Sequence, residues 1–402
     1  KICGSSCVNT TDDPKNCGSC GTVCSSDSCL KGRCVVHADS IWAYQKQTCI
    51  VYQGKLKCWG ENDQGQLGYN HQSNIFQPSD KFVELSGDKV QDIGFTIYSS
   101  EVYVLLQSGH VRYWKEIRNS LPQKQNIAFF EKMTQISKNK PIQLSASSDH
   151  ICMIFQHGDL RCWGFNTHGQ LGYGSTTDIR EPTVQPVDLI GAKAVQVATG
   201  SGHTCVLLEQ GSVKCWGFNL WGQLGYGDNA RMKTAPLKQN VDLLGAKAVQ
   251  VATGSGHTCV LLEQGSVKCW GSNGSGELGY GDQVSKELKP PQQNVDLLGR
   301  KVKQVATGNS HTCVVLREGS IKCWGFNLWG QLGYPDNKRR YLPETKPLWI
   351  GGRTVKSIAC GDSHTCVLMD DKSIYCWGEN TEGRLGHIHS DPLALPVLEL
   401  SR

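Results

Sequence analysis

The sequence lacks the features of a membrane protein and of a nucleic-acid-binding protein. No apolar run approaches the roughly 18 residues that a membrane-spanning helix needs, so we expect no membrane span. The 41 Lys and Arg residues are nearly balanced by 36 Asp and Glu residues, which leaves a net charge of +5 over 402 residues. Proteins that bind nucleic acids usually carry a strongly basic patch or tail. We therefore expect no nucleic-acid partner.

Motifs for catalysis and cofactor binding are also missing. The glycines of Gly325 to Gly330 are not followed by Gly-Lys-Ser/Thr, so they do not form a phosphate-binding loop. No nucleophile–base pair, no metal-ligand spacing and no paired carboxylates recur at equivalent positions. We predict a protein that is not an enzyme and that needs no cofactor or metal. Only a site assembled from several loops, such as that of a carbohydrate-cleaving enzyme, would escape this search.

Cysteine, in contrast, is abundant, with 20 residues. Such a density is typical of oxidising compartments, where disulfides form and persist. The sequence starts at Lys1 without the basic and apolar segments of a leader peptide. We expect a mature secreted protein, extracellular or at the cell surface, whose leader has been removed.

A repeat of about fifty residues organises most of the chain. Seven tryptophans mark it at spacings of 55, 49, 53, 54, 54 and 53 residues, and six of them stand in Cys-Trp-Gly. Residues 188–219 and 242–273 are almost copies of each other. A fixed period of this length indicates a propeller or another repeat array. We assign the seven tryptophans to packing within the blades: Trp59, Trp114, Trp163, Trp216, Trp270, Trp324 and Trp377.

Each repeat has the pattern of four short strands separated by glycine turns. In the fourth repeat we expect strands at residues 187–189, 195–198, 204–208 and 212–216. No segment of the repeat has helical periodicity over a useful length. Four strands in each repeat are typical of a propeller blade.

The repeat resembles that of the RCC1 family. The resemblance rests on Val-x-Gln-Val-Ala-x-Gly-x-x-His-Thr-Cys-Val-Leu followed by Gly-x-Val-x-x-Trp-Gly-x-Asn-x-x-Gly-Gln-Leu-Gly. It covers roughly residues 36–402, with five strong repeats, a fair one at the start and an eroded one near residues 98–118. It implies an all-β fold, a seven-bladed β-propeller of four-stranded blades over residues 37–402. The paired cysteines depart from the family pattern and argue against a nuclear role.

The order of strands suggests how the ring closes. A short apolar segment precedes the inner strand of later repeats, as at residues 82–85 and 187–189, but the first repeat lacks it. The missing copy stands at the C-terminus, residues 396–400. We predict that this C-terminal strand completes the first blade and removes a free sheet edge.

Six repeats carry a pair of cysteines at hairpin spacing. A three-residue loop centred on Gln210 places Cys205 directly opposite Cys215, close enough for a disulfide. The eroded repeat has lost both cysteines together, to Tyr103 and Tyr113, as expected of a bonded pair. Zinc is the alternative, but zinc-binding cysteines usually stand two to four residues apart. We predict the disulfides Cys49–Cys58, Cys152–Cys162, Cys205–Cys215, Cys259–Cys269, Cys313–Cys323 and Cys366–Cys376.

Residues 1–36 form a separate cysteine-rich disulfide module with seven cysteines. The stretch from Asp13 to Cys24 is similar to short modules of the Stig1 type, which occur in secreted proteins. Since seven is odd and Cys360 replaces the Thr of other repeats, we predict that one N-terminal cysteine bonds Cys360. Asn9 and Asn273 stand in glycosylation sequons.

Two turns carry apolar residues where other repeats have polar ones. Trp221 and Trp329 take positions held elsewhere by Gln64, His168, Ser275 or Glu382. Exposed Leu-Trp pairs suggest a contact surface for a protein or a sugar. Lys338, Arg339 and Arg340 are interpreted as a solvated turn. The candidate contact residues are Phe218, Leu220, Trp221, Phe326, Leu328 and Trp329.

A histidine recurs two residues before the first hairpin cysteine in five repeats. A metal-binding ring is one interpretation, but equivalent positions in a propeller are spread around the ring. We therefore expect a structural hydrogen bond within each blade. The five residues are His150, His203, His257, His311 and His364.

Three functions follow from these observations. We favour an extracellular surface or matrix protein that makes protein–protein contacts, including contacts with copies of itself. The alternative is a soluble secreted binder or inhibitor of another protein or a glycan, because secreted members of the RCC1 superfamily include a bacterial β-lactamase inhibitor. The remote alternative, implied by the family resemblance, is a guanine nucleotide exchange factor for a Ran-type GTPase with chromatin binding.

Overall fold

The computed structural model describes residues 38–69, 71–78, 81–85, 87–96, 101–115, 128–129, 139–282, 284 and 286–386. It also places four two-residue strands near the N-terminus, which pair as β1 (Ile2–Cys3) with β2 (Ser6–Cys7) and β3 (Cys29–Leu30) with β4 (Arg33–Cys34). No helix among the described residues combines the length and the apolar character needed to cross a membrane.

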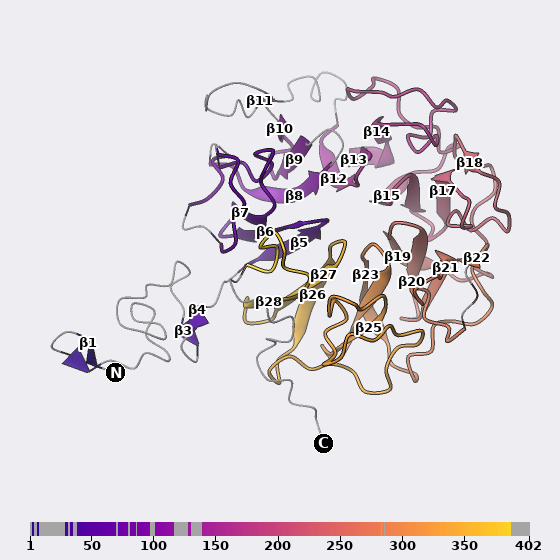
Figure 1. Ribbon diagram of the computed structural model, residues 1–402. Coiled ribbons are helices and arrows are strands. Elements are labelled where there is room, and N and C mark those ends of the chain that lie inside the picture. The colour runs from indigo at the N-terminus through magenta and orange to yellow at the C-terminus, as the bar shows by residue number, and fades with distance from the viewer. Residues whose placement is uncertain are drawn as a thin grey trace.

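Seven larger antiparallel sheets follow one another around a ring (Figure 1). We call them blades one to seven in chain order. The first three blades are β5 (Ser40–Tyr44), β6 (Gln47–Tyr52) and β7 (Lys55–Gly60); β8 (Val90–Phe95), β9 (Glu101–Leu106), β10 (Val111–Lys115) and β11 (Ala128–Phe129); and β12 (Pro141–Ala146), β13 (His150–Phe155) and β14 (Leu160–Gly164). A short 3-10 turn, Gln156–Gly158, links the last two of these strands.

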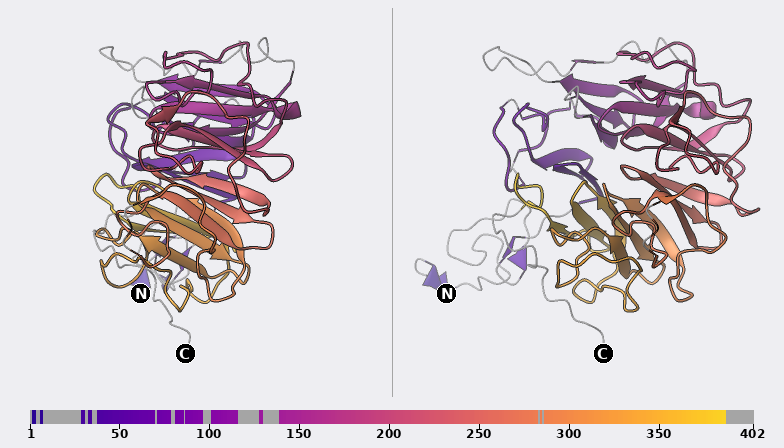
Figure 2. Two further views of the ribbon diagram at one scale, coloured as in Figure 1. Left: turned by 90° about the vertical axis from the view of Figure 1, so that its right-hand side faces the viewer. Right: turned by 45° about the vertical axis from the view of Figure 1, so that its right-hand side comes forward.

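The remaining four blades repeat this arrangement. They are β15 (Ala194–Thr199), β16 (His203–Leu208), β17 (Val213–Phe218) and β18 (Met232–Lys233); β19 (Ala248–Thr253), β20 (His257–Leu262), β21 (Val267–Ser272) and β22 (Lys286–Glu287); β23 (Val302–Thr307), β24 (His311–Leu316) and β25 (Ile321–Gly325); and β26 (Val355–Cys360), β27 (His364–Met369) and β28 (Ile374–Gly378). The first strand of each blade lies toward the centre of the ring (Figure 1), and the strands cross its thickness in the views of Figure 2.

The prediction of four strands in every blade was too regular. Among the described residues, three blades have a fourth strand and four blades have three. In three of the four, single bridges replace the fourth strand, such as Gly164 with Ile179 in the third blade and Gly325 with Arg340 in the sixth. Proline and glycine are frequent in these connecting segments, so continuous pairing is interrupted.

The short apolar segment before each inner strand belongs to the preceding blade. Val187 donates its N–H to the carbonyl of Leu160 on β14 at 2.8 Å, and Val83 pairs with Leu56 on β7. The first blade therefore already has segments bridged to its outer strand β7, at Ile75 and Val83. That residues 396–400 complete this blade stays a prediction. Residues 396–400 themselves lie outside the described part of the chain.

Direct contacts between the first and seventh blades bring the two ends of the ring together. Ala38 donates its N–H to the carbonyl of Lys372 at 2.8 Å, and the ammonium of Lys372 is paired with Asp39 at 2.8 Å. The indole of Trp59 donates to the carbonyl of Arg384 at 3.0 Å. Among the described residues, neighbouring blades supply these closing contacts directly.

The hydrophobic core is divided among the junctions between adjacent blades. At the junction of blades four and five, Leu207 and Val213 of one blade pack with Val251, Val260 and Trp270 of the next. The strand faces are apolar on both sides because each blade is covered by two neighbours. The seven repeated tryptophans are almost completely buried in these junctions.

Candidate functional site

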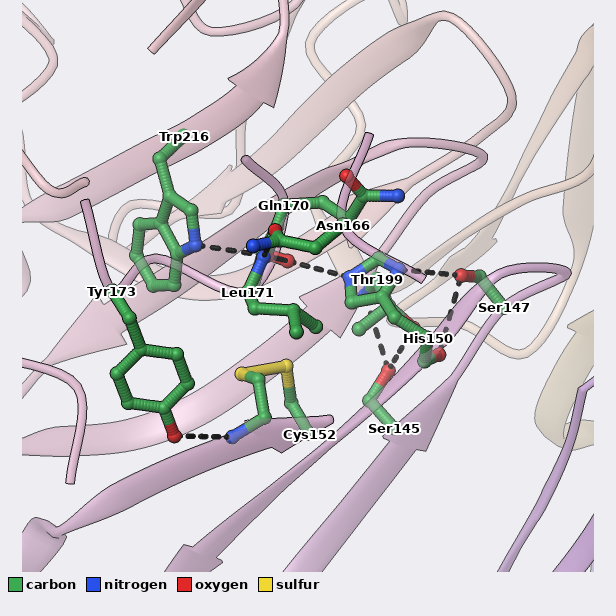
Figure 3. Close-up of a disulfide and its surroundings, with 12 residues drawn as sticks. Ser145, Ser147, His150, Cys152, Asn166, Gln170, Leu171, Tyr173, Thr199 and Trp216 are labelled. Atoms are coloured by element: carbon green, nitrogen blue, oxygen red, sulfur yellow. Dashed lines mark hydrogen bonds between the residues drawn. A yellow bond between two sulfur atoms is a disulfide. The ribbon is translucent and has the colours of Figure 1, made fainter. Parts of the chain in front are cut away.

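The six hairpin cysteine pairs are bonded in the structure. In each pair the two cysteines stand directly opposite each other in the strand register, with Cα atoms 4.1 Å apart. Figure 3 shows the pair Cys152–Cys162, where the N–H of Cys162 donates to the hydroxyl of Tyr173 at 3.2 Å. The same tyrosine contact recurs in other blades, for example from Cys215 to Tyr226 at 3.1 Å.

The second blade has a stacked pair of tyrosines in place of the disulfide. Tyr103 and Tyr113 are directly opposite each other across β9 and β10, and their rings stack at 5.7 Å with 18° between the planes. The hydroxyl of Tyr103 also accepts the indole N–H of Trp163 in the third blade at 3.2 Å. The tyrosine pair thus occupies the cysteine positions that the sequence alignment assigned to it.

The five repeated histidines connect neighbouring blades. The predicted bond within the blade is present for His150, whose Nδ1 atom lies 3.1 Å from the Ser147 hydroxyl (Figure 3), and the prediction was wrong for the other four. Each Nε2 atom lies 2.6–3.1 Å from a threonine hydroxyl of the next blade. The reason is that the ring points sideways out of its own sheet. The pairs are His150–Thr204, His203–Thr258, His257–Thr312, His311–Thr365 and His364–Thr48, and the last joins the seventh blade to the first.

The hydrogen-bond network fixes the tautomer of these histidines. The Thr204 hydroxyl donates to the carbonyl of Gln170 at 2.8 Å, so it must accept from His150, whose Nε2 carries the proton. The indole of Trp216 donates to the same carbonyl at 2.9 Å (Figure 3). The arrangement repeats in the later blades, so one loop carbonyl receives two donors from the following blade each time.

Burial keeps the histidines neutral. Desolvation lowers the pKa of His150, His203 and His311 to about 3 and that of His257 to about 4. A glycine faces the ring in four of the blades: a Cβ at Gly308 would lie 2.1 Å from Cε1 of His311. Glycine leaves room for the histidine ring in these four blades, whereas in the third blade Ser147 takes this position and its hydroxyl lies 3.1 Å from Nδ1 of His150.

A ladder of glutamines lies deeper in the ring. The amide of Gln196 on β15 donates to the carbonyl of Val251 at 3.2 Å and accepts the N–H of Val251 at 2.8 Å. Each such side chain thus pairs with the inner strand of the next blade as a strand backbone would. Gln143, Gln250 and Gln304 repeat this double bond.

The predicted contact residues are exposed, but they lie in two blades that are not adjacent. Trp221 and Leu220 of the fourth blade are 46% and 43% exposed, and Trp329 and Leu328 of the sixth are 48% and 55% exposed. The indole of Trp221 lies over the turn before β20, since a Cβ at Gly256 would be 3.5 Å from its Cδ1 atom.

The aromatic residues that precede these pairs are half-buried. Phe218 contacts His168 of the third blade with ring centroids 4.8 Å apart. The guanidinium of Arg339 lies 5.1 Å from the ring centroid of Phe326. The sequence placed Arg339 in a solvated turn and did not reveal this contact, because the two residues are separated by a loop.

Asn273 and Cys360 do not have the surroundings that the predictions for them require. Asn273 is only 2% exposed, because its side chain holds its loop: it accepts the N–H of Leu278 at 3.1 Å and donates to Asp282 at 3.0 Å. Glycosylation of the folded chain at Asn273 is therefore excluded, and Asn9 lies outside the described residues. Cys360 is a free cysteine whose sulfur faces the sixth blade, so the predicted bond to the N-terminal module is not present.

Comparison with known proteins identifies the repeat array. A family model for the RCC1-like domain matches residues 184–400, more than half of the chain. The chain belongs to the RCC1-like domain family. Models of the single regulator of chromosome condensation (RCC1) repeat match residues 157–207 and 142–170. The similarity of residues 1–36 to Stig1 modules stays a prediction.

The RCC1-like relatives are diverse. The ultraviolet-B receptor UVR8 of Arabidopsis thaliana is 34% identical over 251 residues, 62% of this chain and 55% of UVR8. The E3 ubiquitin-protein ligase HERC2 of Homo sapiens is 30% identical over 243 residues, 60% of this chain and 5% of the ligase. The chain thus matches about half the length of UVR8 and a small part of HERC2.

Solved structures support the RCC1-like fold. Human WBSCR16 superimposes with a TM-score of 0.71 at 20% identity, covering 85% of this chain and 92% of that one. Prp20p of Saccharomyces cerevisiae superimposes with a TM-score of 0.68 at 21% identity, covering 86% of this chain and 83% of that one. At these identities the likeness concerns the fold alone.

Proposed function

We propose that this RCC1-like propeller is a non-enzymatic extracellular protein that binds a protein partner through its Leu-Trp face, defined by Leu220, Trp221, Leu328 and Trp329. The observation that carries the proposal is the exposure of about half of each of these four side chains. Tryptophan in contact with water is energetically unfavourable, and it is strongly enriched at the centres of protein interfaces.

The surroundings of these residues favour a partner with apolar and acidic groups. Arg339 lies beside Phe326 in the sixth blade, next to the exposed Trp329 loop. An arginine beside aromatic rings can offer directional hydrogen bonds to a partner's carboxylates. Among similar structures, Prp20p is described by its binding to Gsp1p and histones. A propeller of this fold thus serves elsewhere as a protein-binding scaffold.

The six hairpin disulfides support an extracellular location. Each joins two cysteines on adjacent strands of one blade, and all of these cysteines except the half-buried Cys376 are buried. Disulfides of this kind are rare in proteins of reducing compartments. The more specific proposal is that the partner is a second copy of this chain, bound through the same face. The alternative is a soluble binder of a different protein or of a glycan.

The experiment compares the native, unreduced protein with the double variant Trp221→Ser/Trp329→Ser. Its matched control is Leu244→Asn/Leu298→Asn, which removes two exposed leucines at the opposite ends of the inner strands. Both leucines have positive φ, which asparagine tolerates. Capture from an extract of the source, followed by affinity measurement, should show a protein bound by the native chain and the control.

Loss of a hot-spot tryptophan should weaken that binding by tenfold or more, about 1.4 kcal/mol. Light scattering across a concentration series identifies the partner class, because a mass that grows only when both tryptophans are present means self-association. Equal binding by the native chain, the tryptophan variant and the control would show that the Leu-Trp face is not the contact surface.

A further inference from the structure

The junction between the sixth and seventh blades holds a free thiol beside a disulfide. Cys360 ends the inner strand β26, and its sulfur, the sulfur of Cys313 and a ring nitrogen of His311 all lie within 4.8 Å of one another. Cys313 is bonded to Cys323 within the sixth blade. The hydroxyl of Thr365 lies between them, 3.9 Å from the Cys360 sulfur and 4.0 Å from the Cys313 sulfur.

The other blades supply an internal comparison. Thr199, Thr253 and Thr307 end their inner strands at the position of Cys360, and Ala146 does so in the third blade. Ser145 and Thr199 bond each other through their hydroxyls at 2.9 Å (Figure 3). In the described residues, only the seventh blade therefore places a nucleophilic sulfur next to the disulfide of its neighbour.

We propose that Cys360 is an alternative disulfide partner of Cys313, so that the disulfide within the sixth blade can be replaced by one across the junction between blades six and seven. The Cys360 thiolate attacks the sulfur of Cys313, and a Cys313–Cys360 bond forms while the Cys313–Cys323 bond breaks. Cys323 leaves as a thiolate and takes up the proton that Cys360 has lost. The exchange needs no oxidant or reductant, because one disulfide replaces another.

The packing of the junction makes the disulfide exchange slow without preventing it. Desolvation raises the pKa of the Cys360 thiol to about 12, so the reactive thiolate is scarce at neutral pH. The histidine cannot act as a strong base there, because burial lowers the pKa of His311 to about 3. Cys360 is partly exposed, unlike the two cysteines of the disulfide that it faces.

Exchange would change which parts of the ring are held covalently. The present bond joins two strands of one hairpin that hydrogen bonds already hold together. A bond between Cys313 and Cys360 would instead join two blades that contact each other only through side chains and turns. Such a bond would lock the junction next to the one where the ring closes.

The test maps disulfides in the native, unreduced protein held at pH 7, 8 and 9 without added thiol. Samples are stopped in acid, alkylated with N-ethylmaleimide in denaturant, digested and analysed by mass spectrometry. The expected product is a peptide joining Cys313 to Cys360, with Cys323 alkylated. It should form about tenfold faster for each pH unit, since the thiolate fraction rises by that factor below the pKa, and its rate should not depend on protein concentration.

Two variants make the test specific. Cys360→Thr should keep the Cys313–Cys323 bond at every pH, and Thr307→Cys should create the same exchange one junction earlier, with Cys259. Alkylated Cys360 with an intact Cys313–Cys323 bond at every pH would overturn the proposal. A bond between Cys360 and an N-terminal cysteine, or a rate that rises with protein concentration, would overturn it as well.

Discussion

In the fourth blade Cys205 and Cys215 face each other across β16 and β17 and are bonded, whereas in the second blade Tyr103 and Tyr113 face each other across β9 and β10 and stack. The difference extends to the junctions. Gln196 of the fourth blade pairs with both backbone groups of Val251, but the second blade has Asp92 on the equivalent part of its inner strand.

Asp92 makes related bonds with different chemistry. Its carboxylate accepts the N–H of Leu144 in the third blade at 3.0 Å and the indole N–H of Trp42 in the first blade at 3.0 Å. Desolvation raises the pKa of Asp92 to about 6, because these two bonds and a third, from the N–H of Ile93 at 3.0 Å, do not fully replace water. The comparison shows that the fold requires a connection at each of these places and accepts several side chains that can make it.

The largest expected effect is a loss of stability in acid, because buried histidines link five of the blades to their neighbours. The unfolded histidines take up protons near pH 6.5, but in the folded chain four of the five do so only near pH 3 to 4, and burial also holds the pKa of His364 well below its usual value. Their contribution to stability is therefore complete above pH 6.5 and is lost as the pH falls, by roughly 1.4 kcal/mol per pH unit for each histidine.

Three half-buried carboxylates, Asp92, Asp149 and Asp362, have pKa values of about 6 and oppose this loss only between about pH 6 and pH 4. The free energy of unfolding should thus fall by several kcal/mol in total between pH 6.5 and pH 4, because the histidines remove more stability than the three carboxylates add. Denaturant unfolding across this range measures the slope. The variant His257→Gln, which copies Gln47 of the first blade, should reduce the slope by one histidine's share, and an unchanged slope would contradict the assignment.

The second expected effect tests the disulfide against the tyrosine pair. The variant Cys205→Ala/Cys215→Ala should unfold with a free energy lower by about 3 kcal/mol, because the unfolded hairpin is no longer restrained. Tyr103→Cys/Tyr113→Cys should form a seventh hairpin disulfide, since the two positions have the same register.

The oxidised form of that tyrosine variant should be about 3 kcal/mol more stable than its reduced form. It should not exceed the native chain, because Trp163 loses the hydroxyl of Tyr103 and the smaller side chains leave a cavity. Thermal unfolding with and without reductant measures both differences. Failure of the two cysteines to pair would mean that the hairpin register alone does not specify the bond.

The smallest expected effect is at Asp92. Its raised pKa means that the carboxyl favours folding at low pH and that this contribution is lost as the pH rises from about 4 to about 6. Asp92→Asn removes the charge but keeps only one of the two acceptor oxygens, which take bonds from Leu144 on one side and from Trp42 and Ile93 on the other. The variant should therefore compare more favourably with the native chain at pH 8 than at pH 4, by about 1 kcal/mol. Equal differences at both pH values would show that Asp92 is not ionised in the folded protein.

The sequence was most informative where a contact lies within one hairpin. The spacing of Cys205 and Cys215 defines their register, and the joint replacement at Tyr103 and Tyr113 identified the exception. It was least informative between blades. The histidine links, the assignment of Val187 to the preceding blade and the free state of Cys360 all depend on how neighbouring blades are placed.

For the Leu-Trp face, the sequence identified Trp221 and Trp329 because their positions accept polar residues in other repeats. It could not reveal that blade five separates them, or that Arg339 lies beside Phe326. The sequon at Asn273 failed for a similar reason: its sequence is local, but its burial depends on a loop that the same asparagine holds closed.

By itself the sequence determined the repeat, the β pattern, the hairpin register and the paired cysteines, because each depends on interactions between residues close together along the chain. The tertiary structure decided which blade each connecting segment completes, which groups link one blade to the next, and which sulfur faces Cys360. Those outcomes depend on the distance and angle between sheets, which are set by the packing of seven blades around one ring.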